Sequence, residues 1–265
     1  MRYSLSIILV LILLVGLSAA CFAQDVLYIV SPMVVEMVEG QTYALGWSAG
    51  GAETVDIEIL GTLTPLGTKS RGALKIQVAR GISAVQNEYS CTLPWIDAVK
   101  FVIRITGRDG TGKQVSVSQK EYRFRPAVLA NRKEDGIYVD LHQKVNQRLY
   151  VQKGGLVARA YIVSSSEKYS WLPATSHPKT PHDHAGVFKA LDKNPSAYSR
   201  QYEVRMPWAM RYLSGHFIHA TSPNFYRLLG GPASHGCNRL TKEDAQTLFK
   251  STPVGTRVEI IGPSK

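Results

Sequence analysis

Short runs of alternating apolar and polar residues follow one another through the first half of the chain. Thr42–Trp47, Thr54–Leu60 and Lys100–Thr106 each carry a large apolar side chain at every second position, and Leu74–Ala79 and Gln114–Ser118 are similar. Turns that contain glycine separate these runs. A period of two residues is typical of strands with one buried face. The pattern therefore predicts an antiparallel β-sandwich over residues 24–126.

The second half begins with strands again and ends on a helix and a strand. Ile137–Leu141, Arg148–Gln152 and Leu156–Val163 predict a meander, and Arg257–Ile261 predicts a final strand. Between them, residues 164–200 are polar and hold four prolines, which indicates irregular chain of the kind that forms a lid or binding loop. The fold class that follows is mainly β, with a few short helices.

One helix is expected after the last cysteine. Thr241 can cap its start, and Asp244 stands three residues on. Ala245, Leu248 and Phe249 share one face, and Pro253 ends the pattern.

The first residues are typical of a secretory signal. Arg2 supplies a positive charge, residues 5–20 are almost wholly apolar, and small residues follow. We expect a signal peptide over 1–23 with cleavage after Ala23. An uncleaved anchor and lipidation of Cys21 are the alternatives. All three place the body of the protein outside the cytoplasm, in the periplasm or cell envelope.

Cysteines and charge narrow the class of protein further. After the signal only Cys91 and Cys237 remain, too few for a disulfide scaffold, and we expect both thiols to be free, with Cys91 a small buried hydrophobe. The net charge is +11, and residues from 127 onward carry 19 Lys and Arg against 10 Asp and Glu. Basic surfaces attract polyanions. Because an exported protein seldom meets nucleic acid, an acidic peptide or envelope polymer is the expected partner.

The candidate chemistry lies between His219 and Arg239. His219 closes an apolar run, and Ser234, His235, Gly236 and Cys237 follow just before the predicted helix. A thiol needs a base or a cation beside it to react as thiolate near neutral pH. Histidine can supply the base, and the backbone at the glycine can direct amides at an oxyanion.

These residues resemble the signature of the L,D-transpeptidase catalytic domain, also named YkuD. A histidine stands fifteen residues before Ser234-His-Gly-Cys237, and Arg239 follows. Further similarities are Val139–Leu141, Leu149–Val151, Thr180-Pro181 before Gly186–Phe188, and Met206-Pro207. The resemblance implies a β-rich catalytic domain over 136–265 that needs no cofactor or metal. Cys237 would be the nucleophile and His219 the base, with His235 and Gly236 supporting catalysis and Ser234, Arg239, Met206 and Tyr212 binding substrate.

By this resemblance the reaction is acyl transfer on peptidoglycan stem peptides. The thiolate would attack the carbonyl of the third stem residue, expel the terminal D-Ala and form a thioester, which an amine of another stem resolves. Carbapenem-type inhibitors would acylate the same thiol. An L,D-carboxypeptidase, a transferase to a lysine of an envelope protein and a decayed wall-binding protein remain alternatives.

Three places depart from the family pattern. Asn238 stands where an apolar residue is usual, Ala220 where glycine is common, and residues 182–185 lengthen the Thr-Pro element. These changes bear on the choice of substrate. His182 and His184, with His177 nearby, also permit a metal-binding interpretation, although solvated loop histidines are the expectation.

The first half resembles the small Ig-like domains related to the fungal cell-wall Ser-Thr-rich anchored family. The similarity follows the order of Ser31-Pro32, Gly40-Gln41, Gly46-Trp47 and Asn87–Pro94. It implies an Ig-like domain over 24–126 that acts as a spacer, joined by a linker over 127–135 to the catalytic domain.

Overall fold

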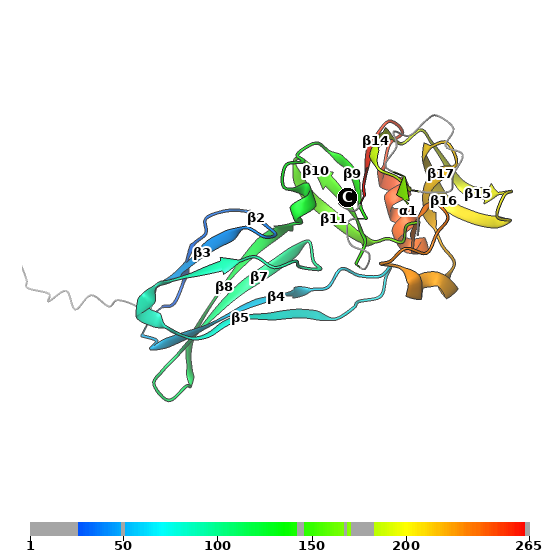
Figure 1. Ribbon diagram of the computed structural model, residues 1–265. Coiled ribbons are helices and arrows are strands. Elements are labelled where there is room, and N and C mark those ends of the chain that lie inside the picture. Colours follow the sequence, from blue (N-terminus) through cyan, green and yellow to red (C-terminus); the bar gives the residue numbers. More distant parts are fainter. Residues whose placement is uncertain (1–25, 49–50, 142–145, 167–168, 171–182, 263–265) are drawn as a thin grey trace, which may run out of the picture.

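The computed structural model describes residues 26–48, 51–141, 146–166, 169–170 and 183–262, and their regular structure is almost entirely β (Figure 1). These residues contain one α-helix and three short 3₁₀ helices, at Ala84–Gln86 (η1), Ala127–Leu129 (η2) and Pro223–Leu228 (η3). The expectation of a mainly β protein with few short helices is confirmed.

Two sheets make up the N-terminal half. The smaller has the order β1-β3-β6, with bounds Ile29–Ser31, Thr42–Trp47 and Glu88–Thr92. The larger has the order β2-β8-β7-β4-β5, with bounds Glu36–Val38, Gln114–Arg125, Lys100–Arg108, Thr54–Thr62 and Ala73–Ser83. All pairs are antiparallel except β2 with β8, which is parallel.

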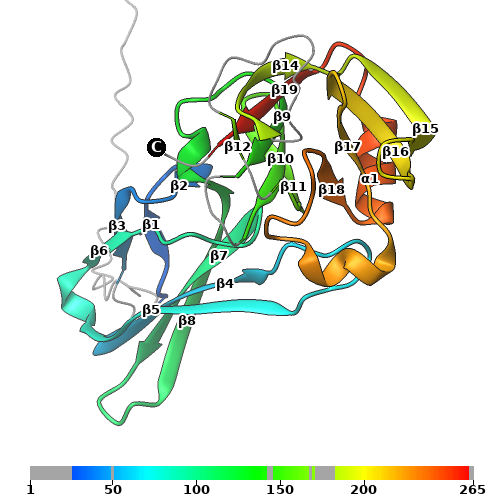
Figure 2. The same cartoon turned by 45° about the vertical axis from the view of Figure 1, so that its right-hand side comes forward.

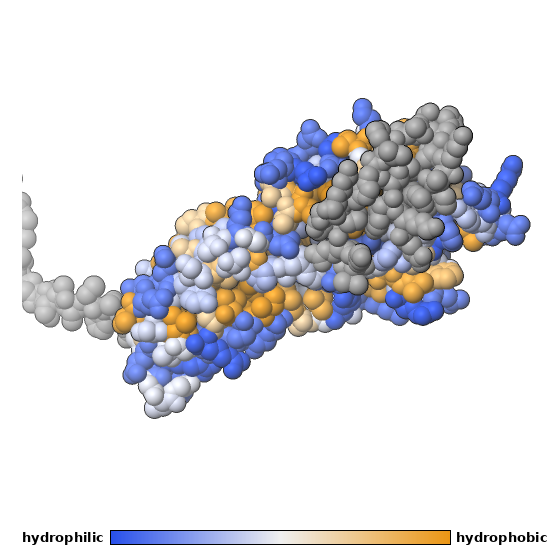
Figure 3. Space-filling model, viewed as in Figure 1, coloured by the Kyte–Doolittle hydropathy of each residue, from blue (hydrophilic) through white to orange (hydrophobic). Residues whose placement is uncertain are grey.

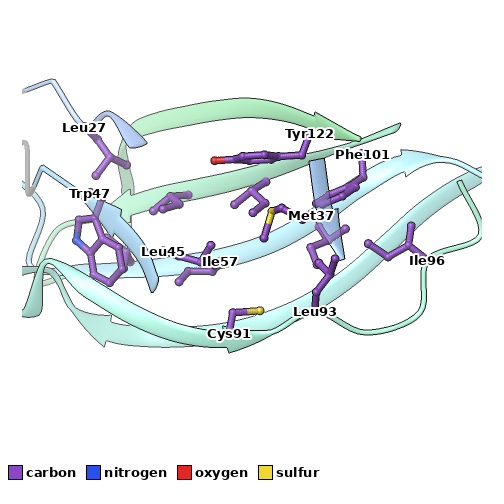
Figure 4. Packing of buried hydrophobic residues seen from close by; sticks show 14 of the residues in the cluster. Leu27, Met37, Leu45, Trp47, Ile57, Cys91, Leu93, Ile96, Phe101 and Tyr122 are labelled. Atoms are coloured by element: carbon purple, nitrogen blue, oxygen red, sulfur yellow. The ribbon is translucent and has the colours of Figure 1, made fainter. Parts of the chain in front are cut away.

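A single core lies between these sheets. Figure 4 shows Leu45 and Trp47 of β3 packed in this core together with Ile57 of β4 and Phe101 of β7. Cys91 lies among them, 5% exposed, and burial raises the pKa of its thiol. Cys91 and Cys237 are both free, as expected. The relation to Ig-like domains of the fungal family stays a prediction.

The C-terminal half holds the remaining sheets. A five-stranded sheet has the order β11-β10-β9-β19-β14, with bounds Leu156–Ile162, Arg148–Lys153, Gly136–Asp140, Arg257–Ile261 and Gly186–Lys189. A four-stranded sheet has the order β15-β16-β17-β18, with bounds Asp192–Ser199, Val204–Leu213, His216–Ala220 and Asn238–Leu240. A two-stranded parallel pair joins β12, Tyr169–Ser170, to β13, Asp183–His184.

The expectation of irregular chain across residues 164–200 was wrong for its described end. That end forms β14 and the eight-residue β15. β15 is the edge strand of its sheet. A proline such as Pro195 has no backbone N–H to donate, and an edge strand tolerates this because one of its sides has no partner strand. Residues 171–182 lie outside the described residues.

The predicted helix is confirmed. Helix α1 spans Lys242–Ser251, and Thr241 caps it by accepting the amide N–H of Asp244 at 3.1 Å. Ala245 and Leu248 are buried against β16 and β17. The helix therefore covers one face of the sheet next to the candidate nucleophile.

Polar contacts join the two halves at three places. Arg148 of β10 donates two hydrogen bonds to Asp97, at 3.0 and 2.8 Å, and both side chains are buried. The guanidinium of Arg125, at the end of β8, contacts Glu36, Gln152 and the Gly155 carbonyl. Figure 2 shows the β4–β5 hairpin extending to the second half, where the Gly67 amide donates to Asp244 at 2.9 Å.

The surface of the N-terminal half exposes several apolar side chains, seen as orange areas in Figure 3. Exposed apolar residues near the start of the described chain include Val26, Met33 and Val35. Among the described residues, no helix has the length and apolarity to cross a membrane.

Candidate active site

The parallel pairing of β17 with β18 brings the candidate residues together. His219 lies opposite Arg239 and Ile218 opposite Asn238. Successive side chains of a strand point to opposite faces. His219 and Arg239 therefore share a face with Cys237, which precedes β18, whereas Asn238 points into the core.

His219 is held by its own neighbour. It is 5% exposed, and its Nδ1–H donates to the Ala220 carbonyl at 2.8 Å. Because a carbonyl can only accept, the proton of the neutral ring lies on Nδ1 and the lone pair on Nε2. Burial, opposed by the Ala220 hydrogen bond and helped by the nearby charge of Arg239, lowers the pKa of His219 to about 4. The imidazole is thus neutral and able to accept a proton at pH 7.

Arg239 is the cation nearest in sequence to the candidate nucleophile Cys237. Burial lowers its pKa and its charge interaction with Cys237 raises it, so the arginine and the sulfur are electrostatically coupled. One guanidinium nitrogen donates to the Ala233 carbonyl at 2.9 Å, which fixes the side chain. A cation held in this way favours the thiolate over the thiol.

Ser234 stabilises the turn before the candidate nucleophile Cys237. The Ser234 Oγ–H donates to the Cys237 carbonyl at 2.6 Å, and Ser234 Oγ accepts the Gly236 amide N–H at 3.2 Å. Gly236 has a φ of 134°, in the region that favours glycine. The Gly236 N–H is therefore engaged with Ser234 rather than directed at a substrate oxygen.

Residues after β11 support the same turn, and sequence reasoning missed them. The Ser165 carbonyl accepts the amides of Ala233 and Ser234, both at 2.8 Å. Ser164 exchanges two backbone bonds with Arg239, at 2.7 and 3.0 Å. Backbone bonds of this kind leave no signal in side-chain chemistry.

A cavity of about 420 Å³ opens at this face. Five of the predicted site residues line it: Cys237, His219, His235, Arg239 and Met206. The wall also contains side chains that the sequence did not single out, namely Tyr198, Gln201, Tyr202, Val204, His216 and Phe217. Met206 packs in a small cluster with Cys237 and Phe217.

Tyr212, predicted to bind substrate, lies behind the cavity instead. It is buried in the core beside Phe188, and its hydroxyl accepts a hydrogen bond from Asn238 Nδ2 at 3.0 Å. Asn238 is 0% exposed, and its Oδ1 has no hydrogen-bond partner among the described residues. The departure at Asn238 thus places a polar contact beneath the candidate nucleophile.

Metal and cofactor ligands were not expected at this site. Among the described residues, no three His, Cys, Asp or Glu side chains are grouped as a metal site. His177, His182 and the side chain of His184 lie outside the described residues, so the metal-binding interpretation of that loop stays open there.

Comparisons with known proteins agree with the motif. The family model of the L,D-transpeptidase catalytic domain, YkuD, matches residues 134–260. The probable L,D-transpeptidase YbiS of Escherichia coli K12 is 52% identical over 44 residues, which are 17% of this chain and 14% of that protein.

Solved structures of similar proteins carry the same family description. The L,D-transpeptidase of Xylanimonas cellulosilytica has a TM-score of 0.39 and 26% identity over 51% of this chain and 64% of that one. L,D-transpeptidase 3 of Mycobacterium tuberculosis, solved with a faropenem-derived adduct, has a TM-score of 0.38 and 13% identity over 91% of this chain and 99% of that one. By the match of the family model and the signature that the fold assembles at one cavity, residues 134–260 are an L,D-transpeptidase catalytic domain of the YkuD family.

Proposed function

We propose that the protein is an exported L,D-transpeptidase that uses Cys237 to cross-link peptidoglycan stem peptides. The observation that carries the proposal is the placement of Cys237 and His219 on one face of the β17–β18 pair, at a single cavity. His219 Nε2 is left as a proton acceptor because Nδ1 is bound to the Ala220 carbonyl.

The first half of the reaction would form a thioester. His219 takes the thiol proton, and Cys237 Sγ attacks the carbonyl carbon of the third stem residue. The tetrahedral intermediate collapses, the bond to the terminal D-Ala breaks, and the leaving amine receives the proton from His219. We expect the backbone amide of Cys237 to donate to the oxyanion, because the Gly236 amide donates to Ser234 Oγ.

The second half would transfer the acyl group. An amine of a neighbouring stem attacks the thioester carbonyl, His219 accepts the proton of that amine, and the sulfur leaves as thiolate. If water replaced the amine, the product would be a free carboxylate and the enzyme an L,D-carboxypeptidase. Transfer to a lysine of an envelope protein would use the same steps.

Incubation with purified tetrapeptide muropeptides and mass analysis tests this function. A dimer with loss of one D-Ala is expected. Monomer that has lost D-Ala would instead indicate the carboxypeptidase. Cys237→Ala should make neither product, and cross-linking by this variant would contradict the proposal. If both proteins were inert yet bound sacculi equally, the decayed wall-binding alternative would be favoured.

Carbapenem-type compounds supply a second probe of the same thiol. Relatives have been solved with imipenem and with a faropenem-derived adduct. We expect a stable mass adduct on Cys237 and none on the buried Cys91.

Export and domain roles complete the proposal. Residues 1–23 would direct the chain to the periplasm or cell envelope and be removed, and residues 24–126 would act as a spacer between the wall and the catalytic domain. Mass analysis of the mature N-terminus after secretion tests the first point.

A further inference from the structure

One side chain at the cavity mouth has a single described partner. His235 is exposed, and its ring stacks on that of Tyr202, with centroids 4.9 Å apart and planes inclined by 18°. Both rings line the cavity that holds Cys237 and His219. Tyr202 thus lines the same cavity as Cys237 although it is distant from the signature in sequence.

Hydrogen bonds within the β15–β16 hairpin hold Tyr202 in place. Residues 200–203 form the turn between β15 and β16. The Tyr202 amide donates to Ser199 Oγ at 3.4 Å, and Gln201 Nε2 donates to the tyrosine hydroxyl at 3.3 Å. Glu203 has a φ of 50°, which bends the backbone directly after Tyr202.

We propose that Tyr202 is a positioning residue that holds the His235 imidazole at the mouth of the active site. The proposal rests on the proposed function. Stacked aromatic rings contribute a modest attraction beyond the area that they bury, and their geometry restricts rotation of both side chains. A fixed imidazole keeps its ring nitrogens directed at bound peptide, whereas a free one samples several rotamers.

The stack identifies which part of Tyr202 matters. The ring makes the contact, and the hydroxyl contacts only Gln201 among the described residues. Tyr202→Phe should therefore restore what Tyr202→Leu removes. From the usual strength of an aromatic pair, Tyr202→Leu should lower kcat/KM about 3- to 10-fold.

A double-mutant cycle with His235→Ala separates positioning from direct contact with substrate. If Tyr202 acts through His235, Tyr202→Leu will cause no further loss in the His235→Ala background. If the two losses multiply, Tyr202 acts independently and the proposal is overturned. Rates of Cys237 acylation by a carbapenem, followed by mass over hours, keep the cycle measurable in slow variants.

NMR of the imidazole carbons and protons supplies a readout that needs no turnover. The Tyr202 ring should shift the His235 resonances, and Tyr202→Leu should return them toward values of a free histidine while Tyr202→Phe retains them. Tyr198→Leu removes the other exposed tyrosine of the hairpin and should leave the His235 resonances in place. Unchanged resonances in Tyr202→Leu would overturn the proposal.

The role of Tyr202 can be tested separately from the proposed function. If the wild-type protein made no product from muropeptides, the proposed function would fall, whereas the His235 resonances and the acylation cycle would still decide the role of Tyr202.

Discussion

Arg239 acts on both groups that exchange the proton in the proposed mechanism. It lies opposite His219 across β17–β18, and its charge lowers the pKa of His219 while interacting with Cys237. One cation therefore stabilises the thiolate and disfavours a second positive charge next to it.

Replacing Arg239 should make Cys237 less reactive near neutral pH. In Arg239→Gln the midpoint of the pH profile for iodoacetamide alkylation of Cys237 should move upward by about one unit, because the favourable charge is lost. Arg239→Lys keeps a charge and should move it less. A midpoint that is the same in the glutamine variant and the wild type would show that the arginine is only structural.

The buried His219 should make stability depend on pH. The unfolded imidazole binds a proton below about 6.5, whereas the folded one resists until about 4. The unfolded state therefore gains protons first as the pH falls, and the free energy of unfolding decreases across this window by about 3 kcal/mol in total.

Urea denaturation at pH 7.5 and pH 5 measures this dependence. His219→Gln cannot titrate, so the part of the slope between pH 6.5 and 4 that belongs to His219 should disappear in that variant. An equal slope in both proteins would mean that His219 has the same pKa in the folded and unfolded states.

At the scale of elements, the cap of α1 is the contact that is easiest to test. Thr241→Ala removes the hydroxyl that accepts the Asp244 amide and donates to the Asp244 carboxylate at 2.8 Å. The loss should be about 1–2 kcal/mol in the free energy of unfolding, read from urea curves. Thr247→Ala changes an exposed threonine of the same helix and should cost almost nothing. Equal losses would contradict the capping role.

Elements with a clear period could be predicted from the sequence. Thr42–Trp47 and Arg257–Ile261 agree with β3 and β19 at both ends, and the helix followed from Thr241 and its apolar face. β15 could not be predicted, because Asn194, Pro195 and Ser196 read as loop. This segment becomes a strand because it pairs with β16. Such pairing is a tertiary contact that the local sequence pattern does not reveal.

Some residues of the candidate site could be predicted from the sequence and others could not. Cys237, His219, His235, Arg239 and Met206 were predicted from the family resemblance, and they line one cavity. Tyr202 and Ser165 were missed because their roles depend on a hairpin turn and a backbone carbonyl. Tyr212 was expected among the substrate contacts, but its alternation along β16 turns it to the core.

Across the whole molecule, buried charge links the two halves. Asp97 belongs to the first half and Arg148 to the second, and Arg71 contacts the same carboxylate. Ionic bonds to the arginines hold the pKa of Asp97 below its usual range despite the opposing effect of burial. Both halves should therefore unfold in one calorimetric transition.

Asp97→Asn should destabilise the whole protein. It leaves the buried Arg148 guanidinium without a carboxylate, which typically costs about 3–5 kcal/mol, so Tm should fall by several degrees. Asp192→Asn breaks an exposed ion pair with Arg211 and should change stability by less than about 1 kcal/mol. Two separate transitions, with the second unaffected by Asp97→Asn, would show that the halves are independent.

The tip of the β4–β5 hairpin contacts the start of α1, because the Gly67 amide donates a hydrogen bond to the Asp244 carboxylate. This helix follows the candidate nucleophile in the chain. A fragment that begins near residue 134 would lose this bond together with the Asp97 carboxylate. Compounds selected against such a fragment would be ranked on an active site that lacks these two supporting contacts. Ligand discovery for this enzyme therefore belongs with the two-part protein.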